Sequence, residues 1–164
     1  MRPAVDKLDA IDTQLLDLLQ REGRIKRTQL AEAVGLSIPS VSDRMRKLEA
    51  RGVLTGFHAR IGAKRTGHDV TAFVFVQSTG SDHYPEFVEA VTALDEVQEL
   101  HSVTGDGSHV LKVRVRNTTG LERLLARLQA VPGVRGTRTS LVLTTHKETA
   151  YLPSEPMALP PASD

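Results

Sequence analysis

The stretch from Thr28 to Arg51 constrains the fold more than any other part of this 164-residue chain. Two segments with helical spacing of apolar residues flank Gly35, which can adopt the left-handed backbone that ends a helix. Ser37 is a suitable N-cap for the second segment, and Pro39 is tolerated in a first helical turn. The pattern therefore predicts two helices joined by a tight turn.

The second of these helices has an apolar face and a polar face. Leu36 and Val41 occupy the two positions of a hydrophobic staple, and apolar residues recur at helical spacing from Ile38 to Leu48. In a helix-turn-helix the second helix enters the major groove, where arginine and lysine reach guanine edges or phosphates and serine allows close approach. The candidate DNA-contacting residues are Ser40, Ser42, Asp43, Arg44, Arg46 and Lys47.

A short basic connector precedes the first of the two helices. Arg24, Lys26 and Arg27 are candidate phosphate contacts, which position a protein on DNA without reading its sequence. The connector is equally compatible with a solvated loop. For the polar helix face, an ordinary helix pair with a solvated basic face is the alternative, because charged faces often have no partner but water. A further helix is expected from Asp9 to Gly23, and it supplies the third wall of a small trihelical core.

Charge is divided unevenly along the chain. Residues 1–65 contain 13 Lys+Arg and 8 Asp+Glu, a net charge of +5, whereas the remaining residues have a net charge of −4. A basic region attracts polyanions and an acidic region repels them. The asymmetry favours a module that faces double-stranded DNA, followed by a module with another task.

Composition excludes several classes of protein. The chain contains no cysteine, which excludes disulfides, thiolate metal ligands and cysteine nucleophiles. No apolar run approaches the roughly 20 residues that cross a bilayer, and no secretory signal is present. We expect a cytoplasmic protein without a membrane partner.

The second part of the chain alternates strands and helices. Residues 53–61 have the alternation of a strand, either as a wing of the helix-turn-helix or as the onward connection. The following segments predict the order βαββαβ, which is typical of a ferredoxin-like split sheet with helices on one face. Its strands are expected at 71–77, 97–103, 110–115 and 134–144, and its helices at 84–94 and 121–129.

This order predicts an α+β protein with a definite domain plan. A split sheet leaves one face uncovered, and pairing two copies is a simple way to cover it, so a homodimer is expected. The last segment has four prolines in its fourteen residues and is expected to be disordered or to wrap on a neighbour. The plan comprises residues 1–61 (helix-turn-helix and connecting strand), 62–69 (linker), 70–150 (second domain) and 151–164 (Pro-rich tail).

Several short motifs, in this order and spacing, resemble the Lrp/AsnC family of transcription regulators, also called feast/famine proteins. The resemblance covers about residues 8–148. Its pieces are Leu8-Asp9-Ala10-Ile11-Asp12, Gly23-Arg24-Ile25, Leu30-Ala31-Glu32-Ala33-Val34-Gly35-Leu36-Ser37, Arg44-Met45-Arg46-Lys47-Leu48-Glu49, Gly52-Val53-Leu54-Thr55-Gly56-Phe57, Val97-Gln98-Glu99-Leu100-His101-Ser102-Val103-Thr104-Gly105-Asp106 and Pro132-Gly133-Val134-Arg135-Gly136-Thr137-Arg138-Thr139.

The resemblance implies an N-terminal winged helix-turn-helix and a C-terminal ferredoxin-like (RAM or ACT-like) domain that senses a ligand. It also implies a homodimer, often assembled further into an octamer, and no cofactor other than a small-molecule effector such as an amino acid. The family's effector site corresponds to the loop between the second and third strands. In this chain the effector-binding candidates are Thr104, Gly105, Asp106, Gly107, Ser108 and His109.

The chain departs from the family at this loop. The common pattern has an aspartate followed by an aromatic or apolar residue, where this sequence has Ser108 and His109. The usual aspartate suits the ammonium group of an amino acid. The departure leaves three alternatives: Asp106 replaces it, another metabolite binds, or the site is unused.

Two other functions are alternatives to that of a local regulator: an enzyme and an architectural DNA-packing protein. An enzyme with Asp106, Ser108 and His109 as a catalytic cluster is disfavoured, because adjacent strand residues alternate sides and no third partner is identifiable. An architectural, weakly sequence-specific DNA-packing protein would use the same basic helix and stays open. The six histidines show no metal-ligand spacing and are expected at the surface or an interface.

Overall fold

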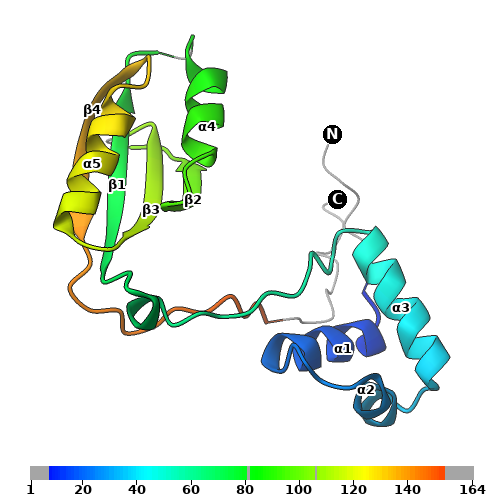
Figure 1. Ribbon diagram of the computed structural model, residues 1–164. Coiled ribbons are helices and arrows are strands. Elements are labelled where there is room, and N and C mark those ends of the chain that lie inside the picture. The colour runs from blue at the N-terminus through cyan, green and yellow to red at the C-terminus, as the bar shows by residue number, and fades with distance from the viewer. Residues whose placement is uncertain (1–7, 81, 106, 154–164) are drawn as a thin grey trace. The chain divides into compact units, whose positions relative to one another are not determined.

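The computed structural model describes residues 8–80, 82–105 and 107–153 (Figure 1). The chain forms two compact units. The first contains the residues up to Ala59 together with the C-terminal segment from Glu148, and the second spans Arg60–Lys147. The chain therefore passes between the units twice.

Three helices form the first unit: α1 (Ala10–Arg21), α2 (Arg27–Val34) and α3 (Ile38–Ala50). Their apolar sides meet in one core, which confirms the predicted trihelical arrangement. Ile38 differs from the rest of its stripe, because it is 44% exposed at the first position of α3. The buried core consists of Leu15, Leu19, Leu30, Ala31, Val41 and Met45.

The helix ends lie where the capping residues predict them. The Asp9 carboxylate accepts a hydrogen bond from the backbone N–H of Asp12, and the Ser37 hydroxyl accepts one from that of Ser40. Gly35 ends α2 with φ at +66°, in the left-handed region that disfavours side chains. This turn sets the direction in which α3 leaves α2.

The prediction of a strand at residues 53–61 is wrong for the single chain. Only a bend and irregular backbone follow α3 there, and a short 3-10 helix, η1 (Ala63–Thr66), follows within the segment expected to be the linker. A strand needs a neighbour to pair its backbone N–H and C=O groups. Within the described part of one chain, no strand pairs with this segment.

The second unit has the predicted order of β1 (Val70–Ser78), α4 (Tyr84–Thr92), β2 (Val97–Ser102), β3 (His109–Val115), α5 (Thr118–Gln129) and β4 (Val134–Leu141). The four strands form one antiparallel sheet in the order β2-β3-β1-β4. This confirms the ferredoxin-like prediction. Helix α5 begins three residues before its predicted start, because the side chain of Asn117 caps the N–H of Gly120 at 2.9 Å.

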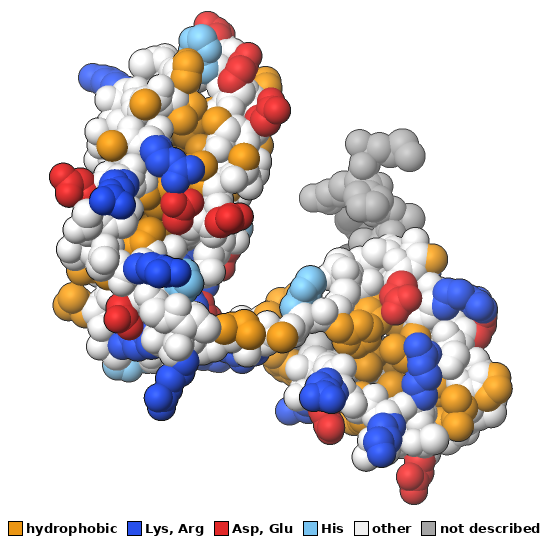
Figure 2. Space-filling model, viewed as in Figure 1, with side chains coloured by type: hydrophobic (Ala, Val, Ile, Leu, Met, Phe, Trp, Pro, Cys, Tyr) orange, Lys and Arg blue, Asp and Glu red, His pale blue; other side chains and the backbone are white. Residues whose placement is uncertain are grey.

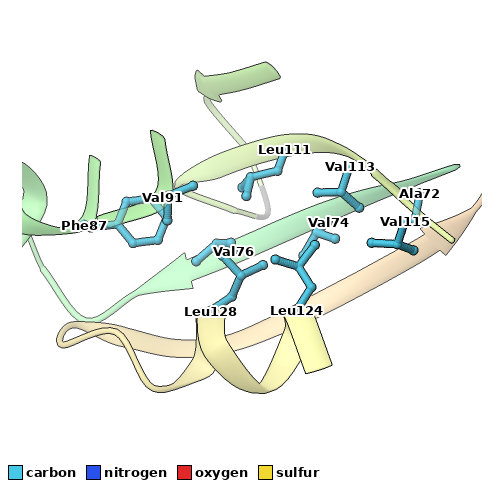
Figure 3. Close-up of a cluster of buried hydrophobic side chains, with 10 residues drawn as sticks. All are labelled: Ala72, Val74, Val76, Phe87, Val91, Leu111, Val113, Val115, Leu124 and Leu128. Carbon is cyan, nitrogen blue, oxygen red and sulfur yellow. The ribbon is translucent and has the colours of Figure 1, made fainter. Parts of the chain in front are cut away.

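The core of this unit lies between the sheet and its two helices (Figure 3). Alternate residues of β1 and β3 point into it, as the two-residue period of a strand requires. The buried side chains are Ala72, Val74, Val76, Phe87, Val91, Leu111, Val113, Val115, Leu124 and Leu128.

Among the residues that the structure describes, no helix lies over the other face of the sheet (Figure 1). Phe73 on β1 is 39% exposed there, and the Arg138 guanidinium lies 4.8 Å from the ring centre of Phe75. Such a face suits the pairing of two copies that the sequence predicts.

Candidate DNA interface and effector loop

The polar face of α3 combines cations with a carboxylate. Asp43 forms ion pairs with Arg46 and with Lys47, the latter at 2.8 Å. Hydrogen bonds from Lys47 and then from Arg46 hold the pKa of Asp43 below its usual range. The side chains of Arg46 and Lys47 are 75% and 68% exposed, so both remain open to a DNA partner. Figure 2 shows acidic and basic side chains side by side on the surface of the first unit, which contains α3.

Arg44 is placed differently from its two basic neighbours. One of its guanidinium nitrogens, Nη1, donates to the carboxylates of Asp9 and Asp12, both at 2.7 Å. These contacts raise the pKa of Arg44, with Asp9 as the larger cause, and its side chain is only 30% exposed. The pKa of Asp9 is lowered chiefly by its capping bond with Asp12 and further by Arg44. Arg44 thus joins α3 to the start of α1.

These carboxylate partners were not identified from the sequence. The capping signal located Asp9, but nothing in the local pattern placed it beside a residue 35 positions away. Only the packing angle of α1 and α3 brings the two together.

The remaining residues predicted to contact DNA have local partners. The hydroxyls of Ser40 and Ser37 lie 2.8 Å apart at the start of α3. Arg27 donates to the Ser42 hydroxyl at 3.0 Å, which connects α2 to α3. The backbone N–H of Lys26 donates to Gln29 at 3.1 Å, while the sites of Arg24 and Lys26 are exposed. Arg24, Lys26, Arg46 and Lys47 are therefore exposed cations of this unit.

The β2–β3 loop is held to the neighbouring strand β1. The backbone N–H of Ser108 donates to the carbonyl of Val76 at 2.9 Å, and the Ser108 hydroxyl accepts from the N–H of Ser78 at 3.3 Å. A Cβ atom on Gly107 would lie 3.3 Å from the same Val76 carbonyl. Glycine therefore suits this close approach.

The outer part of the loop is more open. Thr104 and Gly105 are exposed, and Gly105 has φ at +110°. Asp106, the proposed substitute for the missing aspartate, lies outside the described residues. The structure thus separates the predicted set into an exposed part and a part bound to β1.

His109 lies inside the protein, so its predicted position at a surface is wrong. It is 3% exposed, and its ring centre is 4.6 Å from that of Phe87 and 5.3 Å from that of Tyr84. Neither ring nitrogen has a hydrogen-bond partner among the described residues. Burial lowers the pKa of His109.

Tyr84 connects this buried ring to the surface. It is 45% exposed, and its hydroxyl lies 2.8 Å from that of Ser102 at the end of β2. No local sequence pattern distinguishes Tyr84, because its contacts come from the packing of α4 on the sheet. Tyr84 and Ser102 therefore extend the polar rim of the β2–β3 loop.

A cavity of about 630 Å³ lies at the opposite end of β3 from this loop. Its walls include Val115 and Asn117, and the basic side chains of Arg114, Arg116 and Arg123 also line it, as do Asp95 and Glu96. No sequence pattern pointed to this cavity. Within the described residues, no group of three histidine, aspartate or glutamate side chains is arranged to hold a metal ion, and no helix has the length and apolarity to span a membrane.

Both units match known families. Residues 8–55 match a family described as a winged helix-turn-helix DNA-binding domain, and residues 71–152 match the Lrp/AsnC ligand-binding domain. The chain belongs to the Lrp/AsnC family. It is an Lrp/AsnC transcriptional regulator, with a DNA-binding domain in the first unit and an effector domain in the second.

Relatives and solved structures agree with this assignment. The Leucine-responsive regulatory protein of Escherichia coli is 37% identical over 156 residues, covering 92% of this chain and 93% of the relative. The transcriptional regulator NMB0573 of Neisseria meningitidis, solved with L-methionine, has a TM-score of 0.84 at 27% identity and covers 89% of this chain and 96% of its own.

A feast or famine regulatory protein of M. tuberculosis, Rv3291c, was also solved with L-methionine. Its TM-score is 0.83 at 36% identity, and the match covers 88% of this chain and 98% of that chain. The Lrp/AsnC architecture therefore extends over both units of the present chain.

Proposed function

We propose that this regulator binds operator DNA as a homodimer through the exposed face of α3, and that a small metabolite bound at the loop Thr104–His109 changes the binding. The observation that supports the DNA half most directly is the pair of exposed cations on α3, Arg46 and Lys47. Ser40, Ser42 and Asp43 lie on the same helix and complete the proposed reading surface. Arg24 and Lys26 are proposed phosphate contacts.

Arg44 has a double role in this proposal. Two carboxylates hold its guanidinium in the free protein. A guanine edge offers the two acceptors that suit a guanidinium, so operator DNA competes with Asp9 and Asp12 where it accepts from Nη1. Base recognition through Nη1 therefore requires that these bonds be exchanged.

The proposal that an effector binds is supported by the Thr104–His109 loop and by two solved relatives. L-methionine is present in the two solved relatives, which supports an amino acid or a related compound as the ligand class. In this chain Ser108 stands where the family commonly has an aspartate, so one carboxylate for an ammonium group is absent at that position. We expect an atypical ligand or a weak response to amino acids.

The same proposal includes the pairing of two chains through the open sheet face. It also includes further assembly of dimers to an octamer, which the family resemblance implies. A homodimer presents two copies of α3, which suits an operator with two half-sites. An architectural DNA-packing role is the alternative. It predicts binding with little preference between sequences, because phosphate contacts alone do not specify.

Competition binding separates these two functions. The wild-type protein should prefer its operator over random duplex, and the variant R46A/K47A should lose about tenfold or more in operator affinity, since each contact contributes about 1–3 kcal/mol. Lys64→Ala, which removes an exposed charge in the effector domain, is the matched control. Equal binding to operator and random DNA would favour the architectural role.

Calorimetry tests the effector half. Each of the twenty amino acids is titrated into the full chain and into Ser108→Ala and Asp106→Ala. Tight binding of a common amino acid that ignores both substitutions would place the sensor elsewhere in the effector domain.

A further inference from the structure

The C-terminal segment contacts the side of α1 that faces away from the trihelical core. Asp17, Gln20 and Arg21 provide the polar groups on this side, and none of the three is buried. The segment that meets them is centred on Tyr151 and Leu152, which lie 130 to 134 positions later in the chain than the residues they contact. It follows the effector domain, which ends at Lys147.

Gln20 binds the backbone of this segment at two points. Its Nε2 donates to the carbonyl of Leu152 at 2.8 Å, and its Oε1 accepts from the N–H of the same residue at 2.7 Å. The Leu152 side chain takes little part, because the residue is 74% exposed. The contact therefore requires an extended backbone and an amide side chain, and it does not require leucine.

Tyr151 adds a contact that depends on its side chain. Its hydroxyl donates to the Asp17 carboxylate and accepts from Nη2 of Arg21 at 3.0 Å. The Arg21 guanidinium also lies 5.0 Å from the centre of the tyrosine ring, within the range of a cation–π contact. Asp17 and Arg21 pair with each other at 2.8 Å, so the three side chains form one closed group.

The ionisation of these groups agrees with the geometry. The hydrogen bond to Asp17 raises the pKa of Tyr151, because ionising the phenol would place two negative charges together. The pKa of Asp17 is lowered by Arg21 first and by Tyr151 second. The contact is therefore sensitive to any change that removes the phenolic proton or the carboxylate.

We propose that the α1 surface formed by Asp17, Gln20 and Arg21 is a docking site for the Tyr151–Leu152 segment of the same chain. Because the chain enters the effector domain at Arg60 and leaves it at Lys147, docking attaches the DNA-binding domain to both ends of the effector domain. A second attachment restricts the relative motion of two linked domains and raises their effective concentration. We infer that it strengthens the transmission of effector binding to DNA, a step that rests on the proposed function.

Amide hydrogen exchange in the full chain tests docking without DNA or effector. The Leu152 amide should exchange roughly tenfold more slowly than in an unstructured chain, since it is held by a hydrogen bond with local support. Gln20→Ala should abolish this protection, and Tyr151→Phe should reduce it. Leu152→Ala is the matched control and should keep the protection, because Gln20 contacts only the backbone. Unprotected exchange in the wild-type chain, or protection that survives Gln20→Ala, would overturn the proposal.

Cross-linking identifies the occupant of the site. The chain has no cysteine, so the variant with Glu22→Cys and Leu152→Cys has only two thiols. A short bismaleimide should join them within one chain. A covalent dimer as the main product would contradict docking in the same chain.

The regulatory step has its own readout. The effector-dependent change in DNA affinity should fall severalfold in Gln20→Ala and Tyr151→Phe and stay unchanged in Leu152→Ala. An unchanged response in all three, with exchange protection lost as expected, would overturn the transmission role and leave docking intact. A wild-type chain without any effector response would instead count against the proposed function, while the exchange result would still stand.

Discussion

On α3 each basic residue proposed to contact DNA is already paired with a carboxylate, whereas the ring of His109 is buried with no hydrogen-bond partner among the described residues. Arg44 pairs with two residues of α1, and Asp43 pairs with Arg46 and Lys47. The cations of α3 thus have partners within the chain, whereas the buried ring nitrogens of His109 have none among the described residues.

The two regions differ in how their polar groups are satisfied within the chain. A cation held by a carboxylate is positioned before DNA arrives, and binding exchanges one anionic partner for another. A buried polar group without a partner costs free energy, and such groups require an explanation in a folded protein. The comparison therefore predicts that substitutions on α3 alter DNA selectivity, while substitutions near His109 alter pH dependence and ligand response.

Arg44→Ala should have the largest effect. Loss of a base contact lowers the ratio of operator to random-DNA affinity by about 1–3 kcal/mol, roughly five- to 150-fold. Loss of the contacts with Asp9 and Asp12 also lowers the free energy of unfolding, by about 1 kcal/mol for partly exposed pairs. Competition binding and thermal unfolding measure the two effects.

Asp9→Asn separates the two roles of Arg44. This variant removes the negative charge of one of the two carboxylate partners, while Asp12 and the Arg44 guanidinium itself remain in place. If Arg44 reads a base, Asp9→Asn lowers stability and keeps the specificity ratio. If both variants lower stability and neither changes the ratio, Arg44 is only a link between α1 and α3.

Ser108→Asp should have the next largest effect. It restores the carboxylate that the family commonly has beside the effector, so amino-acid affinity should rise about tenfold, as expected for a charge-assisted hydrogen bond with an ammonium group. Ser108→Asn has the same shape without the charge and serves as the control. Calorimetry with L-methionine gives the result, and an equal gain in both variants would exclude a role for charge.

Asp43→Asn should have a smaller effect. Removing this carboxylate frees Arg46 and Lys47, so binding to random duplex should tighten severalfold at low salt, and the gain should shrink as salt is raised. Glu32→Gln makes the same charge change at an exposed site of α2. Equal tightening in both variants would show that net charge alone is responsible.

The fold could be predicted because its signals are local. Asp9 and Ser37 cap helix starts with their side chains, and Gly35 ends α2 through its left-handed backbone. The alternation along β1 and β3 defines the buried face of the sheet. The predicted start of α5 is three residues too late, because the side chain of Asn117 caps the helix at Thr118. The prediction of a strand at residues 53–61 is wrong because alternation does not provide a partner strand.

The sites could be predicted only in part, because their chemistry depends on contacts distant in sequence. The sequence pattern indicates Arg44 and His109 as candidate site residues. It does not indicate the carboxylates of α1 that bind Arg44 or the aromatic rings of α4 that contact His109. The contact of Tyr151 with α1 joins residues 130 and 134 positions apart and has no periodic signal. Side-chain partners of this kind follow from tertiary packing.

The smallest expected effect is an acid dependence from His109. Burial lowers its pKa, so the unfolded chain, with an ordinary pKa of about 6.5, binds the proton at higher pH than the folded chain does. The free energy of unfolding should therefore fall as pH decreases below about 6.5, until the folded-state pKa is passed, with about 1.4 kcal/mol for each unit by which the pKa is lowered. His109→Phe should flatten this slope between pH 7 and 5, since phenylalanine keeps an aromatic ring beside Tyr84 and Phe87 without a titrating nitrogen. His146→Phe removes an exposed histidine and should leave the slope unchanged. Denaturant unfolding at each pH gives the slopes, and identical slopes for wild type and His109→Phe would mean that the buried ring contributes nothing to acid sensitivity.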